Sequence, residues 1–351
     1  MGMLNNLKIK ITPEILNLIT ELDEFKGAWE LLGQLTPEKL NSLKKVAKIE
    51  SIGSSTRIEG SKLSDREVEK LLLNIKKHSF KSRDEEEVAG YAYVCEEVFS
   101  SYDSIPFTEN VIKQLHGWLL KYSKKDDRHK GEYKKFPNNV EAFDSSGKSL
   151  GIVFETTKPF DTPREMKELI DWTKKLLEEK SLHPLLTIGI FIVVFLSIHP
   201  FQDGNGRLSR VLTTLLLLKS GYIYVMYSSM ESIIENNKEN YYLALRRTQQ
   251  SLKKNKPDFN SWISLFLKSL QKQKSLLEEK IIREKEVLLY LPELSAKILK
   301  LLNSQGRLTI SELESMTNAN RNTIKKHLAS LVESKKIKQH GKGRGTWYTI
   351  S

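Results

Sequence analysis

The spacing of apolar residues predicts a mainly helical chain. Between residues 36 and 60, apolar side chains recur mostly at helical intervals, and Gly60 is a plausible helix stop. Further helices are expected over residues 87–102, 108–121, 163–180, 185–198, 208–219, 240–252 and 260–289. Thr12, Thr36 and Thr162 each precede a proline, which predicts a threonine cap before a proline in the first turn. Residues 64–67, "SDRE", form a capping box.

Two segments depart from this pattern. Residues 131–156 place a turn sequence, "DSSGKS", between short apolar or β-branched runs, which predicts a β-hairpin or flap. From residue 295 onward the order is a helix, two more helices with a short turn between them, and a glycine-rich ribbon, the order of a winged helix. We therefore expect three regions: an N-terminal helical region (1–105), a core region with its following helices (106–290), and a winged helix-turn-helix domain (295–351).

Composition narrows the class of protein. The 351 residues are 39% apolar and carry a net charge of +12, which indicates an anionic partner such as nucleic acid or a nucleotide. Residues 295–351 hold eleven Lys and Arg against three Glu. The single cysteine, Cys95, excludes an intrachain disulfide and fits a reducing compartment. The apolar run at 185–198 is too short to span a bilayer, and the start lacks a signal-peptide pattern, so we expect a cytoplasmic protein without a membrane partner.

The loop after that apolar run, "HPFQDGNGRLSR" at 199–210, carries the chemistry. Pro200 disfavours helical geometry at His199, so the helix should end with an imidazole at its tip, suited to accept a proton. Two glycines allow a tight turn, and the next helix, beginning near Arg207, would offer an N-terminal anion site. Asp203 is a hard ligand for Mg²⁺. The other side chains suit phosphate oxygens: Asn205 through its amide, and Arg207 and Arg210 through guanidinium groups three residues apart.

A base, a metal ligand and an anion cradle within twelve residues indicate phosphoryl or nucleotidyl transfer. The chain has no P-loop and no H-E-x-x-H pattern, and the calcium-loop register fails because Phe201 and Leu212 would fall on ligand positions.

The loop matches every defined position of H-P-F-x-D-G-N-G-R-x-x-R, and in this the chain resembles the Fic family. The resemblance covers roughly residues 40–252. It implies a mainly α, Fic-type helical core with a β-hairpin flap, and transfer of AMP from ATP to a Ser, Thr or Tyr hydroxyl of a protein, which could be the chain itself. The family includes dimers, but no segment of this sequence identifies an interface.

Carried over by position, the resemblance implies a role for each residue of the loop. His199 would be the base, and Asp203 would hold Mg²⁺ on the α- and β-phosphates of ATP. Phe201 is expected to be a core anchor. The remaining positions would contact phosphate oxygens, with Arg207 on the β-phosphate and Arg210 on the γ-phosphate: Gly204, Asn205, Gly206, Arg207 and Arg210.

Two further regions are assigned with less support from the residues themselves. The family's target-docking flap would correspond to "GEYKKFPNNV", with Lys134, Lys135 and Phe136, although many relatives have Arg where this chain has Lys134. Tyr241 and Tyr242 are expected either to flank the adenine or to belong to the core.

"SSTRIEG" at 54–60 fits the family's inhibitory pattern, [S/T]-x-x-x-E-[G/N], through Ser55, Glu59 and Gly60. A Glu59 carboxylate paired with Arg210 would occupy the arginine meant for the γ-phosphate. The resemblance therefore implies autoinhibition, and the alternative is an ordinary ion pair at a helix end. The same Glu59 could instead position water for AMP removal.

The C-terminal domain adds a second candidate function. A recognition helix capped by Asn320 would present cations and an amide to DNA, with two more cations on the wing: Arg321, Asn322, Lys325, Lys326, Lys342 and Arg344. The alternatives to an adenylyltransferase are a nucleotide-sensing DNA-binding regulator and a Fic enzyme with another donor. The intact His199 disfavours the regulator, because binding ATP needs no positioned base.

Overall fold

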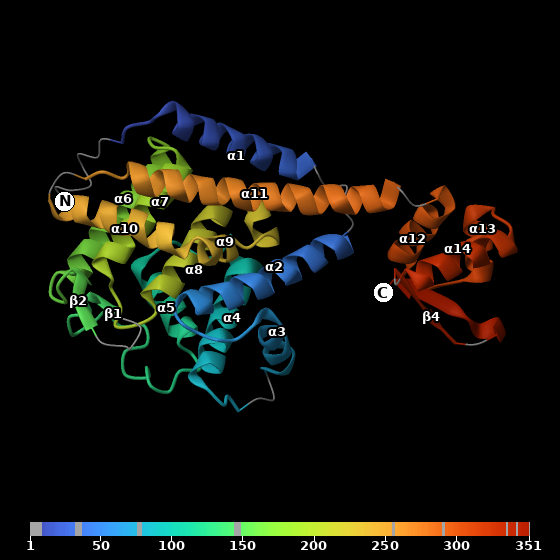
Figure 1. Cartoon of the computed structure of the whole chain (residues 1–351), viewed down its shortest axis with the longest axis horizontal. Helices are drawn as coiled ribbons and strands as arrows, with labels where there is room; N and C mark the ends of the chain where they lie inside the picture. Colours follow the sequence, from blue (N-terminus) through green and yellow to red (C-terminus); the bar gives the residue numbers. More distant parts are fainter. Residues whose placement is uncertain are drawn as a thin grey trace. The chain divides into compact units, whose positions relative to one another are not determined.

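Helices make up most of the structure, as the apolar spacing predicts (Figure 1). This computed structural model describes residues 9–31, 37–75, 79–143, 149–254, 257–289, 292–334, 336–341 and 343–350. The chain divides into two compact units, Met1–Leu32 with Ser42–Ser275, and Gly33–Asn41 with Leu276–Ser351.

The helices before the C-terminal domain are α1 (Pro13–Leu31), α2 (Pro37–Ile58), α3 (Asp65–Asn74), α4 (Arg83–Ser101), α5 (Glu109–Leu119), α6 (Thr162–Glu179), α7 (Pro184–Ile198), α8 (Asn205–Lys219), α9 (Met230–Asn236), α10 (Lys238–Lys253) and α11 (Asn260–Leu289), with a 3₁₀ helix at Ile223–Tyr227.

The apolar run forms α7, which packs against α6 and α8. Thirteen of its fifteen residues are buried. Gly189 lets α11 approach closely, because a Cβ at this position would lie 2.7 Å from Ile263 Cδ1. The Trp262 indole N–H donates to the Gly189 carbonyl at 2.6 Å. The helix that ends at His199 is therefore a rigid core element.

The predicted hairpin consists of β1 (Val140–Phe143) and β2 (Ser149–Phe154), which pair antiparallel with Val140 opposite Phe154. Most of its expected turn, residues 144–148, lies outside the described residues.

Helix starts agree with the sequence signals in part. The Glu67 carboxylate accepts the Ser64 backbone N–H at 2.9 Å, as the capping box requires, and Thr12 Oγ1 accepts the Ile15 N–H at 3.2 Å. The Thr162 cap is wrong: α6 begins one residue earlier, Asp161 is its N-cap, and the Thr162 hydroxyl donates to the Lys158 carbonyl. Thr36 lies outside the described residues.

Two helices begin earlier than predicted. Helix α4 starts at Arg83 rather than residue 87, because Ser82 Oγ accepts the Glu85 N–H and caps a polar first turn that apolar spacing does not reveal. Helix α8 starts at Asn205 rather than residue 208, directly after the left-handed Gly204. Helix α2 ends at Ile58, and Gly60 has a φ of 109°, as expected for a glycine stop.

The C-terminal domain follows the predicted element order. It comprises α12 (Glu293–Gln305), β3 (Leu308–Thr309), α13 (Ile310–Thr317), α14 (Arg321–Glu333), β4 (Ile337–His340), a 3₁₀ turn at Gly343–Gly345 and β5 (Trp347–Ile350). The strands form one antiparallel sheet in the order β3-β5-β4. The three helices and the sheet share a core that includes Leu302, Leu313, Ile324, Leu328 and Tyr348.

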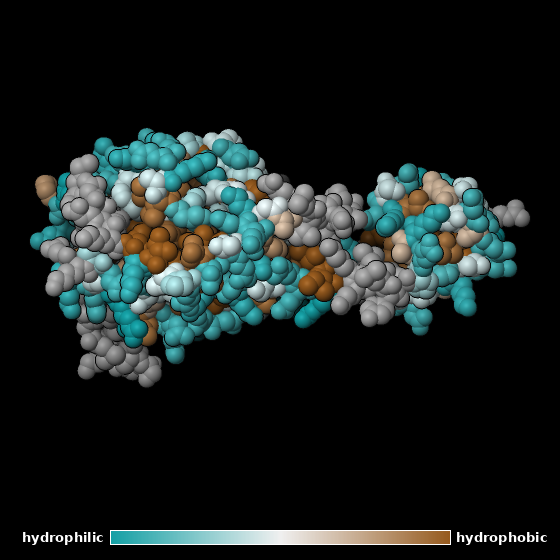
Figure 2. All heavy atoms as spheres, turned by 90° about the horizontal axis from the view of Figure 1, so that it is seen from above, coloured by the Kyte–Doolittle hydropathy of each residue, from teal (hydrophilic) through white to brown (hydrophobic). Residues whose placement is uncertain are grey.

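Hydrophilic side chains cover most of the face shown in Figure 2, with an apolar area on the larger unit. Within the described ranges, no helix combines the length and the apolar character needed to cross a bilayer.

Candidate active site

The loop between α7 and α8 makes two left-handed turns. His199 caps the end of α7 with φ 53°, and Gly204 precedes α8 with φ 78°. Glycine suits the second turn for two reasons. A Cβ at this position would lie 3.2 Å from Leu119 Cδ2, and a residue with a side chain would be strained at this positive φ. The two turns place His199 at the tip of α7 and direct the N-terminus of α8 into the same region, as expected from the sequence.

His199 is oriented as a base. Its Nδ1 lies 3.3 Å from the Leu196 carbonyl oxygen, which assigns the ring proton to Nδ1 and leaves the lone pair of Nε2 for a substrate. Burial lowers the pKa of His199 to about 4, and the nearby Lys134 charge acts in the same direction. The imidazole is therefore neutral at pH 7 and able to accept a proton.

A cavity of about 500 Å³ opens beside His199, large enough for a nucleotide. Its lining includes Asp203, Gly204, Asn205, Gly206 and Arg210.

The lining of the cavity also includes both tyrosines that the sequence analysis singled out. Tyr241 is largely buried and packs edge-on against Trp262, so it is a core residue that also borders the cavity, whereas Tyr242 is more exposed. Arg246 and Gln249 also line the cavity and were not identified from the sequence.

Asp203 meets a partner at each carboxylate oxygen. Oδ1 accepts the Gly204 N–H at 2.6 Å, and Oδ2 accepts from Arg83 Nη2 at 2.9 Å. Burial alone would raise the pKa of Asp203, but Arg207, the Gly204 N–H and Arg83 outweigh burial and lower it. Asp203 is therefore an ionised carboxylate on the cavity wall.

This arrangement fits Mg²⁺ in the form that nucleotide sites use, with one carboxylate from the protein and the other ligands from phosphates and water. Among the described residues, no three His, Cys, Asp or Glu side chains gather as an all-protein metal site.

Arg207 lies elsewhere than predicted. Its side chain is only 2% exposed and does not line the cavity. Its Nη1 lies 3.0 Å from Glu87 Oε2 on α4, and its Nη2 lies 3.4 Å from Asp203 Oδ1. The expectation that Arg207 and Arg210 present neighbouring guanidinium groups to phosphates is therefore not met in this structure, because Glu87 draws Arg207 away.

Asn205 also has a different task from the one expected. Its Oδ1 accepts the Phe201 N–H at 2.9 Å, and its Nδ2 donates to the Phe201 carbonyl at 2.7 Å. Phe201 is fully buried, as predicted, and stacks on the His116 ring at a centroid distance of 3.9 Å. His116 Nε2 lies 3.0 Å from the Asp203 carbonyl oxygen, and the Gly131 N–H donates to His116 Nδ1 at 2.9 Å. Asn205 and His116 thus brace the loop.

Arg210 is bound by α2. Its Nη2 donates to Glu59 Oε1 at 2.7 Å and to the Ser55 carbonyl at 2.9 Å, and its Nε donates to Ser55 Oγ at 2.8 Å. Burial alone would lower the pKa of Arg210, but the Glu59 carboxylate outweighs burial and raises it. Gly206 leaves room for Glu59, because a Cβ there would collide with Glu59 Oε1. The structure thus brings Ser55, Glu59 and Arg210 together in the pattern that the sequence motif implies.

The end of α2 that carries Glu59 has anchors of its own. Arg57 Nε and Nη2 donate to the two Glu235 carboxylate oxygens at 2.7 and 3.0 Å, and Arg57 Nη1 donates to Asp65 Oδ1 at 2.9 Å. Lys238 Nζ donates to the Ile58 carbonyl at 2.6 Å. These contacts hold the helix end that presents Glu59.

The root of the hairpin is bonded directly to the loop. Lys134 Nζ donates to the carbonyl of Ile198 at 2.9 Å, and Lys134 N donates to that of Pro200 at 2.8 Å. Asn138 Nδ2 donates to the carbonyls of His199 and Phe201, at 3.1 and 2.6 Å. Four consecutive carbonyls of the loop are thus held by two residues.

The expectation that Lys134 docks a target is therefore wrong. Its side chain is 97% buried, and burial lowers the pKa of Lys134 to about 8. Lys135 and Phe136 are exposed, as docking residues would be.

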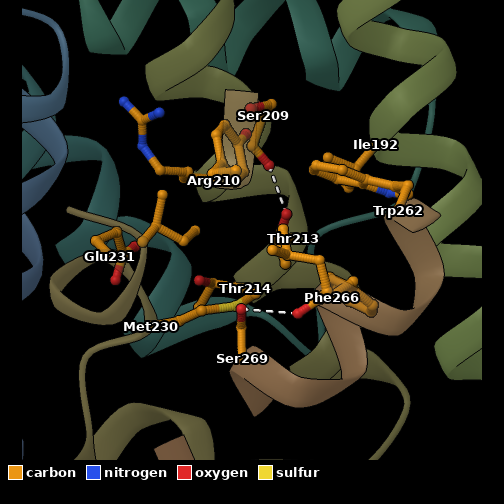
Figure 3. A pocket seen from close by; sticks show the side chains of 13 residues that line it. Ile192, Ser209, Arg210, Thr213, Thr214, Met230, Glu231, Trp262, Phe266 and Ser269 are labelled. Atoms are coloured by element: carbon orange, nitrogen blue, oxygen red, sulfur yellow. Dashed lines mark hydrogen bonds between the residues drawn. The ribbon is translucent and has the colours of Figure 1, made fainter. Parts of the chain in front are cut away.

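A second, much smaller cavity lies between Ser209, Thr213, Trp262 and Phe266 (Figure 3). It measures about 20 Å³, room for about one water molecule. The Arg210 guanidinium points away from Trp262 in this view (Figure 3). We regard this cavity as a packing gap and the cavity beside His199 as the functional one.

Comparison with known proteins agrees with this geometry. The sequence model described as the Fic/DOC family matches residues 106–217, the segment from before α5 to near the end of α8. Through this segment, about a third of its length, the chain is similar to proteins of the Fic family. The Fic segment includes His199, Asp203 and Arg210, whereas Glu59, Tyr241 and Tyr242 lie outside it. Residues 291–347 match a separate family, described as a bacterial protein of unknown function (DUF977).

Named relatives of the Fic segment share moderate sequence identity. A "probable protein adenylyltransferase" of Aquifex aeolicus is 31% identical over 101 residues, 29% of this chain and 28% of that protein. A "protein adenylyltransferase Fic" of Drosophila grimshawi is 27% identical over 206 residues, 58% of this chain and 40% of that protein. The chain thus spans less than half the length of either relative.

Solved Fic structures share the fold. A Fic family protein of Desulfovibrio desulfuricans superposes with a TM-score of 0.63 at 23% identity, over 98% of both chains. Fic-1 of Caenorhabditis elegans superposes with a TM-score of 0.60 at 17% identity, over 78% of this chain and 73% of that one.

Proposed function

We propose that this protein transfers AMP from ATP to a Ser, Thr or Tyr hydroxyl of a target protein. The observation that carries the proposal is His199, a neutral imidazole with Nε2 free, facing a nucleotide-sized cavity that Asp203 and the N-terminus of α8 also line. The printed names of the Aquifex and Drosophila relatives support the same activity.

In this proposal, His199 Nε2 takes the proton of the target hydroxyl. The hydroxyl oxygen then bonds to the α-phosphorus of ATP, and pyrophosphate leaves with the electron pair of the broken bond. Backbone N–H groups at the N-terminus of α8, including that of Gly206, would bind phosphate oxygens. Mg²⁺ on Asp203 would supply charge neutralisation for the phosphates.

We also propose that the protein is autoinhibited. The Glu59 carboxylate occupies the Arg210 guanidinium at 2.7 Å, so a γ-phosphate meets an arginine whose charge is already neutralised. ATP could bind with its phosphates misplaced for in-line attack. Glu59 would act from the N-terminal region (1–105) on a catalytic core at 106–290.

The target would pair its backbone with the hairpin, with exposed Lys135 and Phe136 flanking it. Target specificity beyond a hydroxyl side chain would depend on this surface.

For the C-terminal domain (295–351), a winged helix, we propose DNA binding through α14. Arg321, Asn322, Lys325 and Lys326 are all exposed, although Arg321 also donates to Glu314 Oε2 at 2.8 Å. Lys342 lies outside the described residues, as does the Arg344 side chain. Binding of labelled duplex DNA across a salt series tests the proposal, because Lys325→Ala with Lys326→Ala should weaken binding and flatten its salt dependence. No salt-dependent binding by the full chain would refute it.

Incorporation of α-labelled ATP into the protein itself and into a cell lysate, with Mg²⁺, tests the transferase. We compare wild type, Glu59→Gly, and Glu59→Gly combined with His199→Ala. Strong labelling in Glu59→Gly alone supports transfer and inhibition together. Absence of labelling in every form, despite measurable ATP binding, would refute AMP transfer; labelling from a different nucleotide would replace the donor.

A further inference from the structure

Asp203 belongs to a closed ring of four charged side chains. Arg83, the first residue of α4, donates to Asp203 Oδ2 at 2.9 Å and to Glu87 Oε1 at 2.7 Å. Arg207 Nη1 lies 3.0 Å from Glu87 Oε2, and its Nη2 lies 3.4 Å from Asp203 Oδ1. Two cations and two anions alternate, so each carboxylate lies between two arginines.

The four members differ in exposure. The side chains of Arg207 and Glu87 are 2% and 11% exposed, whereas those of Arg83 and Asp203 are 50% and 35% exposed. Arg207 and Glu87 therefore form a buried pair that neither can leave without stranding a charge. Arg83 is half exposed and can exchange its carboxylate partner for water at little cost.

The two oxygens of Asp203 also differ. Oδ1 receives the Gly204 N–H and faces Arg207, and both contacts are part of the loop and α8. Oδ2 is held by Arg83 alone among the interactions described above. The oxygen that could be given up to a cation is therefore Oδ2.

We infer that Arg83 and Glu87 set the divalent-cation affinity of Asp203 in opposite directions. Glu87 is a buried anionic partner for Arg207, and this pairing weakens the attraction between Arg207 and Asp203. Arg83 is a displaceable cation on Oδ2, with which the metal competes. Both are positioning residues, and the inference rests on the proposed function, in which Asp203 is the Mg²⁺ ligand.

Removing each residue should therefore have an opposite effect on metal binding. Arg83→Gln removes the competitor, so divalent cations should bind about two- to five-fold more tightly, the range set by a solvent-exposed ion pair. Glu87→Gln leaves Arg207 with Asp203 as its remaining carboxylate, so binding should weaken about tenfold, as for other residues that support a metal ligand. A merely structural role would predict loss in both variants.

The test is a titration of the full chain with Mn²⁺, in which binding is measured by the loss of the electron paramagnetic resonance signal of free Mn²⁺. The nucleotide is α,β-methylene ATP, which cannot transfer AMP because carbon replaces the oxygen between the α- and β-phosphorus. Asp203→Asn defines the binding that depends on Asp203. Arg164→Gln is the matched control, an exposed arginine near a helix start whose ion pairs within the described part of the chain are with carboxylates of α6 and its N-cap.

Tighter binding in Arg83→Gln, weaker binding in Glu87→Gln and no change in Arg164→Gln support the inference. Equal affinities for all three and wild type, with Asp203-dependent binding intact, would overturn it while the metal assignment of Asp203 stands. Weaker binding in Arg83→Gln would overturn it as well and make Arg83 a nucleotide contact. If Mn²⁺ binding never depends on Asp203, the metal assignment itself fails. Should Glu87→Gln unfold, Arg83→Gln alone still decides.

Discussion

Replacing Glu59 with glycine should make the protein less stable and more active. Glu59 and Arg210 are 31% and 5% exposed, so their ion pair lies between the exposed and the buried class. Exposed pairs contribute up to about 1 kcal/mol, and breaking a buried pair costs roughly 3–5 kcal/mol. We therefore assign the Glu59–Arg210 contact about 2 kcal/mol, between these limits.

That energy has two measurable consequences. Without nucleotide, Glu59→Gly should unfold about 4–8 °C lower than wild type, since 1 kcal/mol shifts the melting temperature of a domain this size by roughly 2–4 °C. In the variant, the γ-phosphate no longer competes with a carboxylate for Arg210. The same 2 kcal/mol then favours productive ATP binding by about 30-fold, because about 1.4 kcal/mol corresponds to a factor of ten.

Thermal unfolding with and without MgATP, together with α-label incorporation, measures both effects. Adding MgATP should raise the melting temperature of Glu59→Gly by more than that of wild type, because tighter binding to the folded state stabilises it. Glu69→Gln is the control, since it removes an exposed ion pair between Glu69 on α3 and Lys45 on α2, away from Arg210. A lower melting temperature with unchanged ATP affinity and unchanged labelling would show that Glu59 is only a structural partner of Arg210.

Three further outcomes follow from the same contacts. With the pKa of His199 lowered to about 4, transfer by Glu59→Gly should stay level down to about pH 5 and fall through about pH 4; a midpoint near 6.5 would contradict the assigned base. Burial also lowers the pKa of fully buried His116 to about 4, so its proton binds more tightly in the unfolded chain. The free energy of unfolding should therefore fall by about 2–3 kcal/mol between pH 7 and 4.5, and urea titrations of wild type and His116→Gln should differ by that amount. Glu235→Gln should raise labelling about two- to five-fold, less than Glu59→Gly, because Arg57 keeps Asp65 as a partner; labelling at the wild-type level would show that Glu235 does not hold the inhibitory helix.

The sequence reveals the elements whose signals are local. The apolar run of α7, the proline after His199 and the glycine stop after α2 each act within a few residues, and each is found where expected. The pairing of Glu59 with Arg210 was predicted across 151 residues only because a family pattern linked the two segments.

The directions of polar side chains could not be predicted, since they depend on partners far along the chain. Glu87 draws Arg207 out of the cavity from α4, and His116 supports the loop from 87 residues away. A lone histidine or glutamate on a helix carries no sign of such a partner. Lys134 was assigned to the docking flap by family resemblance alone, and that assignment could not show that its side chain donates to the Ile198 carbonyl and its backbone N–H to the Pro200 carbonyl.

The bonds from Lys134 and Asn138 to four consecutive carbonyls join the root of the hairpin rigidly to His199, the proposed base. The position of a strand that pairs with the hairpin is thereby fixed relative to His199, so the pairing register sets which of its residues lies beside the imidazole. Shifting the pairing by one residue would move each target hydroxyl by about 3.3 Å and turn it to the other face. Such an enzyme would choose among neighbouring hydroxyls of one flexible segment by their distance along the backbone, with little need to recognise the side chains around them.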